Sequence, residues 1–258
     1  MTVITSSQNP KIKLVRALLG RAKERREAGA FVVEGVRLVE EAERGGWEFR
    51  FALYDESLND RGKLIIEGLT VRSIEVDEVS QSVMKSLSET ETPQGILAVL
   101  ELKQLPITNS PDFLLIPDQV RDPGNLGTLL RTGAAAGVQA VLLPPETTDA
   151  FAPKVVRSGM GAHFRLPILS MTWEEIRRKT RDLQVYLADM DGKSYWETDF
   201  RQPLALIIGG EAEGASEAAR NLATQRVSIP MAGHVESLNA SVAGSVLMFE
   251  VLRQRLHV

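Results

Sequence analysis

Three short segments in the second half of the chain combine glycines with polar residues that could bind a ligand or take part in a reaction. They read DPGNLGTLLR from Asp122 to Arg131, IIGGEAEGAS from Ile207 to Ser216, and VSIPM…ESLNASVA from Val227 to Ala243. The guanidinium of Arg131 stays charged near neutral pH and only donates hydrogen bonds, so binding an anion or stabilising a negative oxygen suits it better than removing a proton. Adjacent glycines allow another group to approach the backbone closely.

Each segment also has a purely structural interpretation. Asn125 could cap a helix, and Arg131 could form a salt bridge on the surface. The glycines of the second segment could form a plain turn between a strand and a helix. Ser237 or Asn239 could simply cap the last helix.

The surrounding sequence predicts an α/β sheet that would hold these three segments. Near-continuous apolar runs, typical of strands buried on both faces of a parallel sheet, occur at 113–116, 140–143, 183–188 and 204–208. Helical stretches alternate with them at about 124–136, 149–160, 172–181, 216–223 and 238–256. This alternation favours right-handed crossovers and a mostly parallel sheet. The last helix is apolar on more than one side, which indicates burial against two surfaces.

The first hundred residues predict a separate α/β module. Asn9 is a suitable N-cap, Pro10 suits the first helical position and Gly29 suits the end, so one helix is expected over 10–28. Further elements are a helix over 36–44 and strands at about 31–33, 47–54, 71–76 and 95–102. Residues 103–112, KQLPITNSPD, have the composition of a connector between the modules.

The charge distribution is uneven. Residues 1–30 contain seven basic and two acidic side chains, a net charge of +5, so the remaining 228 residues carry −9 of the chain's total of −4. Such an asymmetry can mark a face that binds a polyanion, although a solvated helix surface would look the same. The residues that we expect to contact phosphates are Lys11, Arg16, Lys23 and Arg26.

The sequence also excludes several classes of chemistry. The absence of cysteine removes disulfides, thiolate nucleophiles and cysteine zinc sites, and three widely separated histidines predict no metal site. The GKS at 192–194 lacks the P-loop glycine at position 187, no strand leads into G-x-G-x-x-G, and there is no G-x-S-x-G. No apolar run approaches the ~20 residues of a membrane span, and no targeting pattern opens the chain, so we expect a cytoplasmic protein away from membranes.

In their order and spacing, the three segments together resemble the motifs of the SpoU family of RNA ribose methyltransferases, also called the TrmH family. The residues that match are Asn125 and Arg131 in the first motif, Gly209, Glu211, Gly214 and Ser216 in the second, and Ile229, Met231, Ser237, Leu238, Asn239 and Ser241 in the third. The N-terminal module is similar to the L30e-like substrate-binding domain common in this family, through FVVEG at 31–35 and TPQG at 92–95.

The resemblance implies a domain organisation, a fold and an assembly. An L30e-like RNA substrate-binding domain is expected over 1–103, and a SpoU-type catalytic domain over 112–258. The catalytic domain would contain a mostly parallel α/β sheet with a deep trefoil knot. The protein would form a homodimer with its active site at the subunit boundary. It would transfer a methyl group from S-adenosylmethionine to a ribose 2′-hydroxyl, with 23S ribosomal RNA favoured as the substrate.

The resemblance also assigns roles to individual residues. The catalytic residues would be Arg131, Asn125, Glu211, Ser237 and Asn239. The resemblance implies that Arg131 is the base, whereas the chemistry of the guanidinium favours a clamp on the adjacent phosphate that also stabilises the developing negative oxygen. Both roles stay open at this point. The cofactor would be held by Gly209, Gly210, Gly214, Ile229, Met231 and Leu238.

Three alternatives stay open at this point. The substrate could be transfer RNA, or the methyl group could go to a base, as in a different knotted family. The chain could also be a ribosome-assembly factor that binds RNA without methylating it. The joint presence of Asn125, Arg131, Glu211 and Asn239 disfavours this last alternative.

Overall fold

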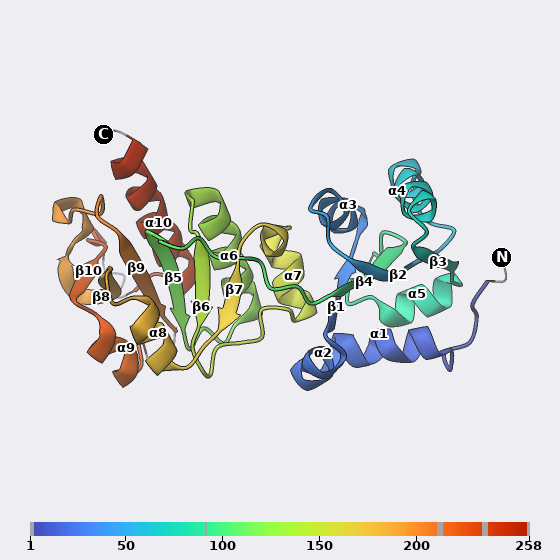
Figure 1. Ribbon diagram of the computed structural model, residues 1–258, viewed down its shortest axis with the longest axis horizontal. Coiled ribbons are helices and arrows are strands. Elements are labelled where there is room, and N and C mark those ends of the chain that lie inside the picture. Colours follow the sequence, from blue (N-terminus) through green and yellow to red (C-terminus); the bar gives the residue numbers. More distant parts are fainter. Residues whose placement is uncertain (1–2, 91, 211–213, 234–236, 257–258) are drawn as a thin grey trace. The chain divides into compact units, whose positions relative to one another are not determined.

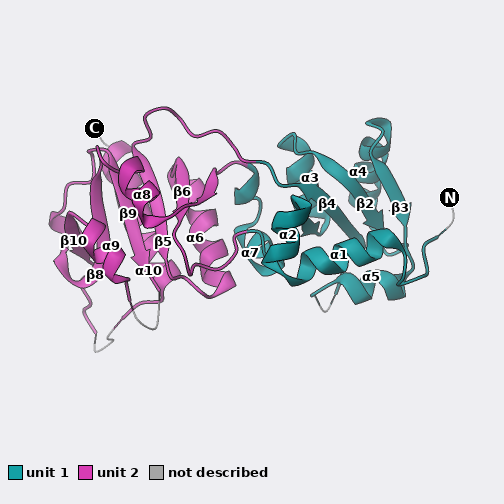
Figure 2. Ribbon diagram, turned by 60° about the horizontal axis from the view of Figure 1, so that its bottom comes forward, with its two compact units in different colours: residues 1–103, 151–164 teal, residues 104–150, 165–258 magenta. Residues whose placement is uncertain are grey.

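The computed structural model describes residues 3–90, 92–210, 214–233 and 237–256. The chain divides into two compact units, each built around its own sheet (Figure 2). Unit 1 comprises residues 1–103 and 151–164, and unit 2 comprises residues 104–150 and 165–258. None of the helices in the described part of the chain combines the length and apolar character needed to cross a membrane.

Unit 1 is a four-stranded mixed sheet in the order β1-β4-β2-β3 with helices packed on it (Figure 1). Its elements are α1 (Pro10–Gly20), α2 (Ala22–Ala28), β1 (Ala30–Glu34), α3 (Val36–Arg44), β2 (Phe49–Tyr54), α4 (Asp60–Val71), β3 (Glu75–Glu78), α5 (Gln81–Leu87), β4 (Ile96–Glu101), α7 (Pro153–Gly159) and the 3-10 turn η1 (Ala162–Phe164). Strand β4 runs antiparallel to β1 and β2, while β2 and β3 are parallel.

Two expectations for this unit were wrong. The helix predicted over 10–28 breaks at Arg21, whose backbone is extended at φ −112° and ψ 140°. Gly20 lowers helix propensity at the break, and Arg25 is buried there, with its guanidinium donating to the carbonyl of Leu18 at 2.6 Å. The strand predicted over 71–76 begins only at Glu75, because Val71 still belongs to α4.

The segment 151–164 also differs from the sequence-based expectation, which placed it in the second module. It packs in unit 1 through its aromatic side chains. The ring of Phe151 lies 5.0 Å from that of Phe31, and the ring of Phe164 lies 5.4 Å from that of Trp47, which is fully buried. Aromatic pairs of this kind bury large apolar areas, which explains why the segment joins a core that is distant in sequence.

Unit 2 is a six-stranded sheet in the order β10-β8-β9-β5-β6-β7, in which every described pairing is parallel. Its elements are β5 (Phe113–Asp118), α6 (Pro123–Ala136), β6 (Ala140–Leu143), β7 (Ile168–Ser170), α8 (Trp173–Lys179), β8 (Gln184–Ser194), the 3-10 turn η2 (Tyr195–Glu197), β9 (Leu204–Gly209), α9 (Glu217–Leu222), β10 (Gln225–Ser228) and α10 (Ala240–Leu256). The predicted α/β class and mostly parallel sheet are confirmed.

Helices α6 and α10 lie side by side at close range (Figure 1). A Cβ atom on Gly244 of α10 would lie 2.5 Å from a methyl carbon of Leu129 on α6, so a larger residue there would require the Leu129 side chain to move. At the next residue of α10, the hydroxyl of Ser245 donates to that of Thr132 on α6 at 3.1 Å. This contact fixes the start of α10, which carries the third motif, beside the start of α6, which carries the first.

Candidate active site

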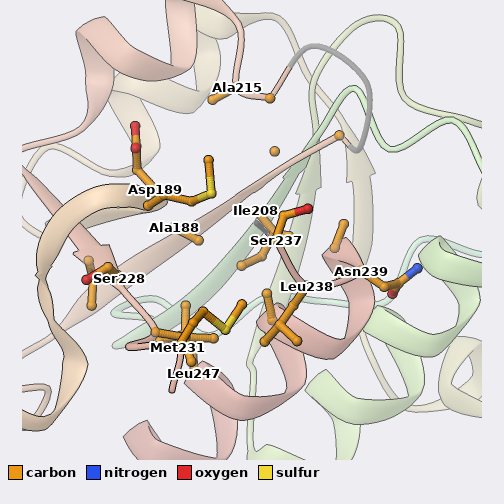
Figure 3. A pocket seen from close by; sticks show the side chains of 18 of the residues that line it. Ala188, Asp189, Ile208, Ala215, Ser228, Met231, Ser237, Leu238, Asn239 and Leu247 are labelled. Carbon is orange, nitrogen blue, oxygen red and sulfur yellow. The ribbon is translucent and has the colours of Figure 1, made fainter. Parts of the chain in front are cut away.

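The middle of β8 and the carboxyl ends of β9 and β10 border a cavity of about 880 Å³ within unit 2 (Figure 3). Its walls come from β8, the turn after β9, the turn after β10 and the start of α10. In Figure 3, Asp189 lies on one side of the cavity and Ser237 and Leu238 lie across from it. Open α/β sheets bind their ligands at this edge, because the loops that follow parallel strands gather there.

The cavity is bordered by all six residues that were expected to hold the cofactor: Gly209, Gly210, Gly214, Ile229, Met231 and Leu238. Two of the glycines are required by the tight turn after β9. A Cβ atom on Gly209 would lie 2.8 Å from the backbone nitrogen of Ala215, and one on Gly210 would lie 2.4 Å from the carbonyl oxygen of Gln119. Gly214 adopts φ +69°, which also favours glycine.

Strand β8 contributes a wall that the sequence analysis missed. Strand β10 pairs with it at Leu187 and next at Lys193, so residues 188–192 leave the regular ladder. Ala188, Asp189 and Met190 in this excursion line the cavity. A Cβ atom on Gly192 would lie 2.5 Å from the backbone nitrogen of Val227, so this glycine lets the strand return to β10. A glycine next to acidic residues, a few positions after the strand predicted over 183–188, is the signal that could have indicated this bulge.

The first and third motifs meet through a direct hydrogen bond. The side-chain amide of Asn239 donates to Oδ1 of Asn125 at 3.0 Å, and the hydroxyl of Ser241 donates to the same oxygen at 3.2 Å. The interpretation of Asn125 as a helix cap is wrong, because Asp122 caps α6 by accepting from the Asn125 backbone N–H at 2.8 Å. The Asn125 side chain is therefore available to join the two motifs.

Asn239 has a structural role and a place at the cavity together. Its Oδ1 accepts from the backbone N–H groups of Ser241 at 2.9 Å and Val242 at 3.2 Å, which caps α10. The same residue lines the cavity, as does Ser237. Its side chain points from the cavity rim toward α6 (Figure 3), so capping fixes the direction in which the amide group donates to Asn125.

Arg131 lies on α6 away from the contact with α10. It is exposed, it does not line the cavity, and it has no hydrogen-bond or ion-pair partner in the described part of the chain. The structural interpretation of this residue as half of a surface salt bridge is therefore wrong within the described residues. Glu211, the remaining candidate catalytic residue, falls outside the described residues.

Asp118 is a buried carboxylate beside the cavity that the sequence analysis did not identify. It ends β5, is 0% exposed, and its Oδ2 accepts from the backbone N–H of Ser216 at 2.6 Å. Ser216 in turn caps α9 by accepting from the N–H of Ala219 at 3.2 Å. Burial raises the pKa of Asp118, against the lowering effect of the bonds from Ser216. Asp118 thus anchors the second motif to β5; a charged residue ending a buried strand was its only sequence signal.

The four predicted RNA contacts in unit 1 differ in how far their charges are compensated. The side chain of Lys11 is only 21% exposed and is paired with Asp77 and, at 2.6 Å, with Glu75. Arg16 is exposed and donates to neutral groups of Ser7 and Ser86. Exposed Lys23 pairs with exposed Glu27 at 3.6 Å, an interaction of small energy.

Arg26 is exposed and has no partner among the described residues. Of the four predicted contacts, Arg16, Lys23 and Arg26 are therefore the ones that present positive charge to solvent.

Comparison with known proteins identifies the chain. The model of the SpoU rRNA methylase family matches residues 112–249, which is more than half of the sequence. The chain belongs to the SpoU rRNA methylase family. A second model, the MRM3-like substrate binding domain, matches residues 9–98 of this SpoU methylase. The family predicted from the three motifs is confirmed.

Several relatives align with this SpoU methylase over nearly its whole length. The 23S rRNA (uridine(2479)-2′-O)-methyltransferase of Streptomyces viridochromogenes is 34% identical, over 97% of this chain and 92% of its own. The 23S rRNA (guanosine(2553)-2′-O)-methyltransferase RlmP of Bacillus subtilis is also 34% identical, over 97% of this chain and 99% of its own.

Solved structures agree with the fold of this SpoU methylase. The AdoMet-bound rRNA methyltransferase of Sinorhizobium meliloti has a TM-score of 0.87 and 32% identity, over 98% of this chain and 97% of that one. The SpoU methyltransferase AviRb of Streptomyces viridochromogenes, in complex with AdoMet, has a TM-score of 0.84 and 32% identity, over 97% of this chain and all of that one. Both contain S-adenosylmethionine, the cofactor expected from the motifs.

Proposed function

We propose that this SpoU methylase transfers a methyl group from S-adenosylmethionine to a ribose 2′-hydroxyl of 23S ribosomal RNA. The observation that carries the proposal is the hydrogen bond between Asn239 and Asn125, which joins the cavity to the helix of Arg131. Relatives with full-length alignments are named for 2′-O-methylation of 23S rRNA at a uridine in one case and a guanosine in another. These two relatives differ in the nucleotide they are named for, so the proposal does not include the identity of the methylated nucleotide.

The cavity suits a bent adenosyl cofactor. It combines apolar walls from Ile229, Met231 and Leu238 with a turn whose glycines leave the backbone accessible. When bound, S-adenosylmethionine supplies an activated methyl group on a sulfonium. The remaining task of the protein is to align the ribose oxygen with that methyl group and to stabilise the negative charge that develops on the oxygen.

The residues of the chain divide this task. The guanidinium of Arg131 binds the phosphate next to the target ribose and stabilises the developing oxyanion. Asn125 and Asn239, held together at 3.0 Å, orient the ribose at the cavity rim, with Ser237 and Glu211 completing the site. Because a guanidinium does not give up its proton near neutral pH, Arg131 acts as a donor throughout. The proton of the 2′-hydroxyl leaves to water as the oxygen bonds to the methyl group and the carbon–sulfur bond breaks, which releases S-adenosylhomocysteine.

A direct assay tests this function. The protein is incubated with methyl-labelled S-adenosylmethionine and unmodified ribosomal or transfer RNA, and the labelled RNA is hydrolysed in alkali. A 2′-O-methyl nucleotide resists cleavage of its 3′ bond, so label in alkali-stable dinucleotides from ribosomal RNA is expected. Label in mononucleotides would indicate base methylation, label only in transfer RNA would change the substrate, and no label would favour a non-catalytic RNA-binding factor.

The expected assembly is a cytoplasmic homodimer in which α10 meets the second subunit. An apolar stripe of Val242, Phe249 and Leu256 repeats every seven residues along α10, and these side chains are 47–68% exposed. Arg131 does not line the cavity of its own chain, which supports an active site shared between subunits. The trefoil knot around the cavity loops and the L30e-like character of unit 1 belong to the same proposal.

The dimer can be tested by placing a charge in this stripe. Phe249→Glu is expected to convert the dimer to a monomer in light-scattering measurements and to remove most methyl transfer, because a buried unpaired carboxylate opposes association. Leu64→Glu is the matched control, since Leu64 is an exposed leucine of unit 1 at 68%. A fully active, dimeric Phe249→Glu variant would exclude this surface.

Removing the side chain of Asn239 tests whether it contributes to catalysis in addition to capping α10. Asn239→Ala is expected to lower methyl transfer by about a hundredfold, because it removes the amide that donates to Asn125 at the cavity rim, while loss of the cap costs about 1 kcal/mol of stability. Asn59→Ala provides the control: Asn59 caps α4 in unit 1 by accepting from the N–H of Gly62 at 2.9 Å. If both variants lose similar stability and both keep their activity, Asn239 is only a cap.

A further inference from the structure

We propose that Arg220 binds the carboxylate of the cofactor's methionine moiety, and that this contact distinguishes the full cofactor from neutral adenosyl compounds. The inference rests on the proposed placement of S-adenosylmethionine in the cavity of unit 2. Arg220 was not among the residues expected from the motifs. It lies in the last turn of α9 and lines the cavity.

The position of the guanidinium follows from its contact with the turn after β9. Nη2 of Arg220 lies 3.8 Å from the point that a Cβ atom on Gly214 would occupy. Gly214 has no side chain and adopts φ +69°, so the guanidinium lies directly over the backbone of a cavity-lining turn. The exposed side chain of Arg220 is thus placed at the cavity itself.

Within the described residues Arg220 has no carboxylate partner, whereas nearby Arg226 pairs with Asp189 at 3.6 Å. Among the described lining residues, Asp189 and Arg220 are the two charged side chains. Asp189 is already engaged by Arg226 and by the backbone N–H of Asp191 at 3.1 Å. The described wall of the cavity therefore presents one cation that is ready to receive an anionic group.

Helix α9, which carries Arg220, is anchored to the end of strand β5. Asp118, fully buried at the end of β5, accepts from the backbone N–H of Ser216, and Ser216 caps α9. Ala219, next to Arg220, is itself buried in the core of unit 2. A ligand-binding side chain is most effective when its backbone is fixed in this way, because less freedom is lost on binding.

The chemistry of the cofactor selects its carboxylate as the partner. S-adenosylmethionine has one anionic group, the α-carboxylate, beside an ammonium, a sulfonium and a neutral nucleoside. Guanidinium and carboxylate match in a two-pronged, charge-assisted hydrogen bond. An RNA phosphate is the competing partner, but the cavity that contains Arg220 is the one that the cofactor-binding glycines surround, which favours the carboxylate.

The test compares two ligands that differ in the amino-acid part. S-adenosylhomocysteine has the carboxylate, whereas 5′-deoxy-5′-methylthioadenosine shares the adenosine and the thioether but lacks it. Calorimetric titration of the full-length protein is expected to show that Arg220→Ala weakens S-adenosylhomocysteine by roughly tenfold and leaves methylthioadenosine within about twofold. Arg220→Lys should restore part of the affinity for S-adenosylhomocysteine, because lysine retains the positive charge but cannot donate two parallel hydrogen bonds to a carboxylate.

Arg177→Ala is the matched control, since Arg177 is an exposed arginine in the last turn of another short helix, α8, outside the cavity lining. Equal weakening of both ligands by Arg220→Ala, or no weakening of either, would overturn the assignment. Loss of RNA affinity with unchanged affinity for both ligands would overturn it in favour of a phosphate. If the unaltered protein binds neither ligand, the proposed placement of the cofactor fails instead.

Discussion

Replacement of Arg131 by alanine is expected to reduce the rate of methyl transfer by about a hundredfold to a thousandfold. A loss of this size is typical when one hydrogen-bond donor to a developing oxyanion is removed. The side chain is exposed, has no partner within the described residues and lies outside the cavity. Its removal should therefore change the free energy of unfolding by no more than about 0.5 kcal/mol and leave the affinity for S-adenosylhomocysteine unchanged.

Three measurements on the same preparation decide this prediction: single-turnover methyl transfer, calorimetric cofactor affinity and the melting temperature. Arg131→Lys should recover only part of the rate, because an ammonium cannot bind a phosphate through two parallel hydrogen bonds. Arg177→Ala, on the exposed side of α8, should behave like the unaltered protein in all three. A large fall in melting temperature for Arg131→Ala, with normal activity per folded molecule, would show that the arginine is structural.

Reversal of the exposed charges on α1 and α2 is expected to weaken RNA binding and to flatten its dependence on salt. The variant is Arg16→Glu, Lys23→Glu and Arg26→Glu together. Lys11 is left unchanged, because a glutamate there would face Glu75 and Asp77 and destabilise unit 1. Each lost phosphate contact should lower the slope of log affinity against log salt by roughly 0.7 to 0.9, so about two to three units in total.

The control for this variant reverses the same number of charges elsewhere. Arg177, Arg178 and Lys179 form an exposed basic turn at the end of α8 in unit 2. Their reversal should leave the salt slope close to that of the unaltered protein. Cofactor affinity should stay constant in both variants, because the cavity lies entirely in unit 2. Equal slopes for the α1–α2 variant and the unaltered protein would mean that this helical face is only solvated.

The sequence by itself was sufficient for most of the strands and helices and for the family. Strands such as β5 and β9 are buried on both faces, so their apolar runs are continuous and visible without a structure. The glycines of the second motif are required by close backbone contacts, and because only glycine fits such contacts, they can be recognised in the sequence. Helix caps are less certain: Asp122 and Asn125 are both good capping residues, and α6 uses the first.

Only the tertiary structure determined which distant residues meet. The partners Asn125 and Asn239 are 114 residues apart, Asp118 reaches Ser216 across 98 residues, and Arg220 belongs to no motif at all. Residues 151–164 belong to unit 1, although the residues on both sides of them belong to unit 2, and their aromatic rings pack in unit 1. Periodicity and residue type report whether a side chain is buried locally, but the identity of its partner depends on how the strands are ordered and how closely the helices pack, which no local pattern contains.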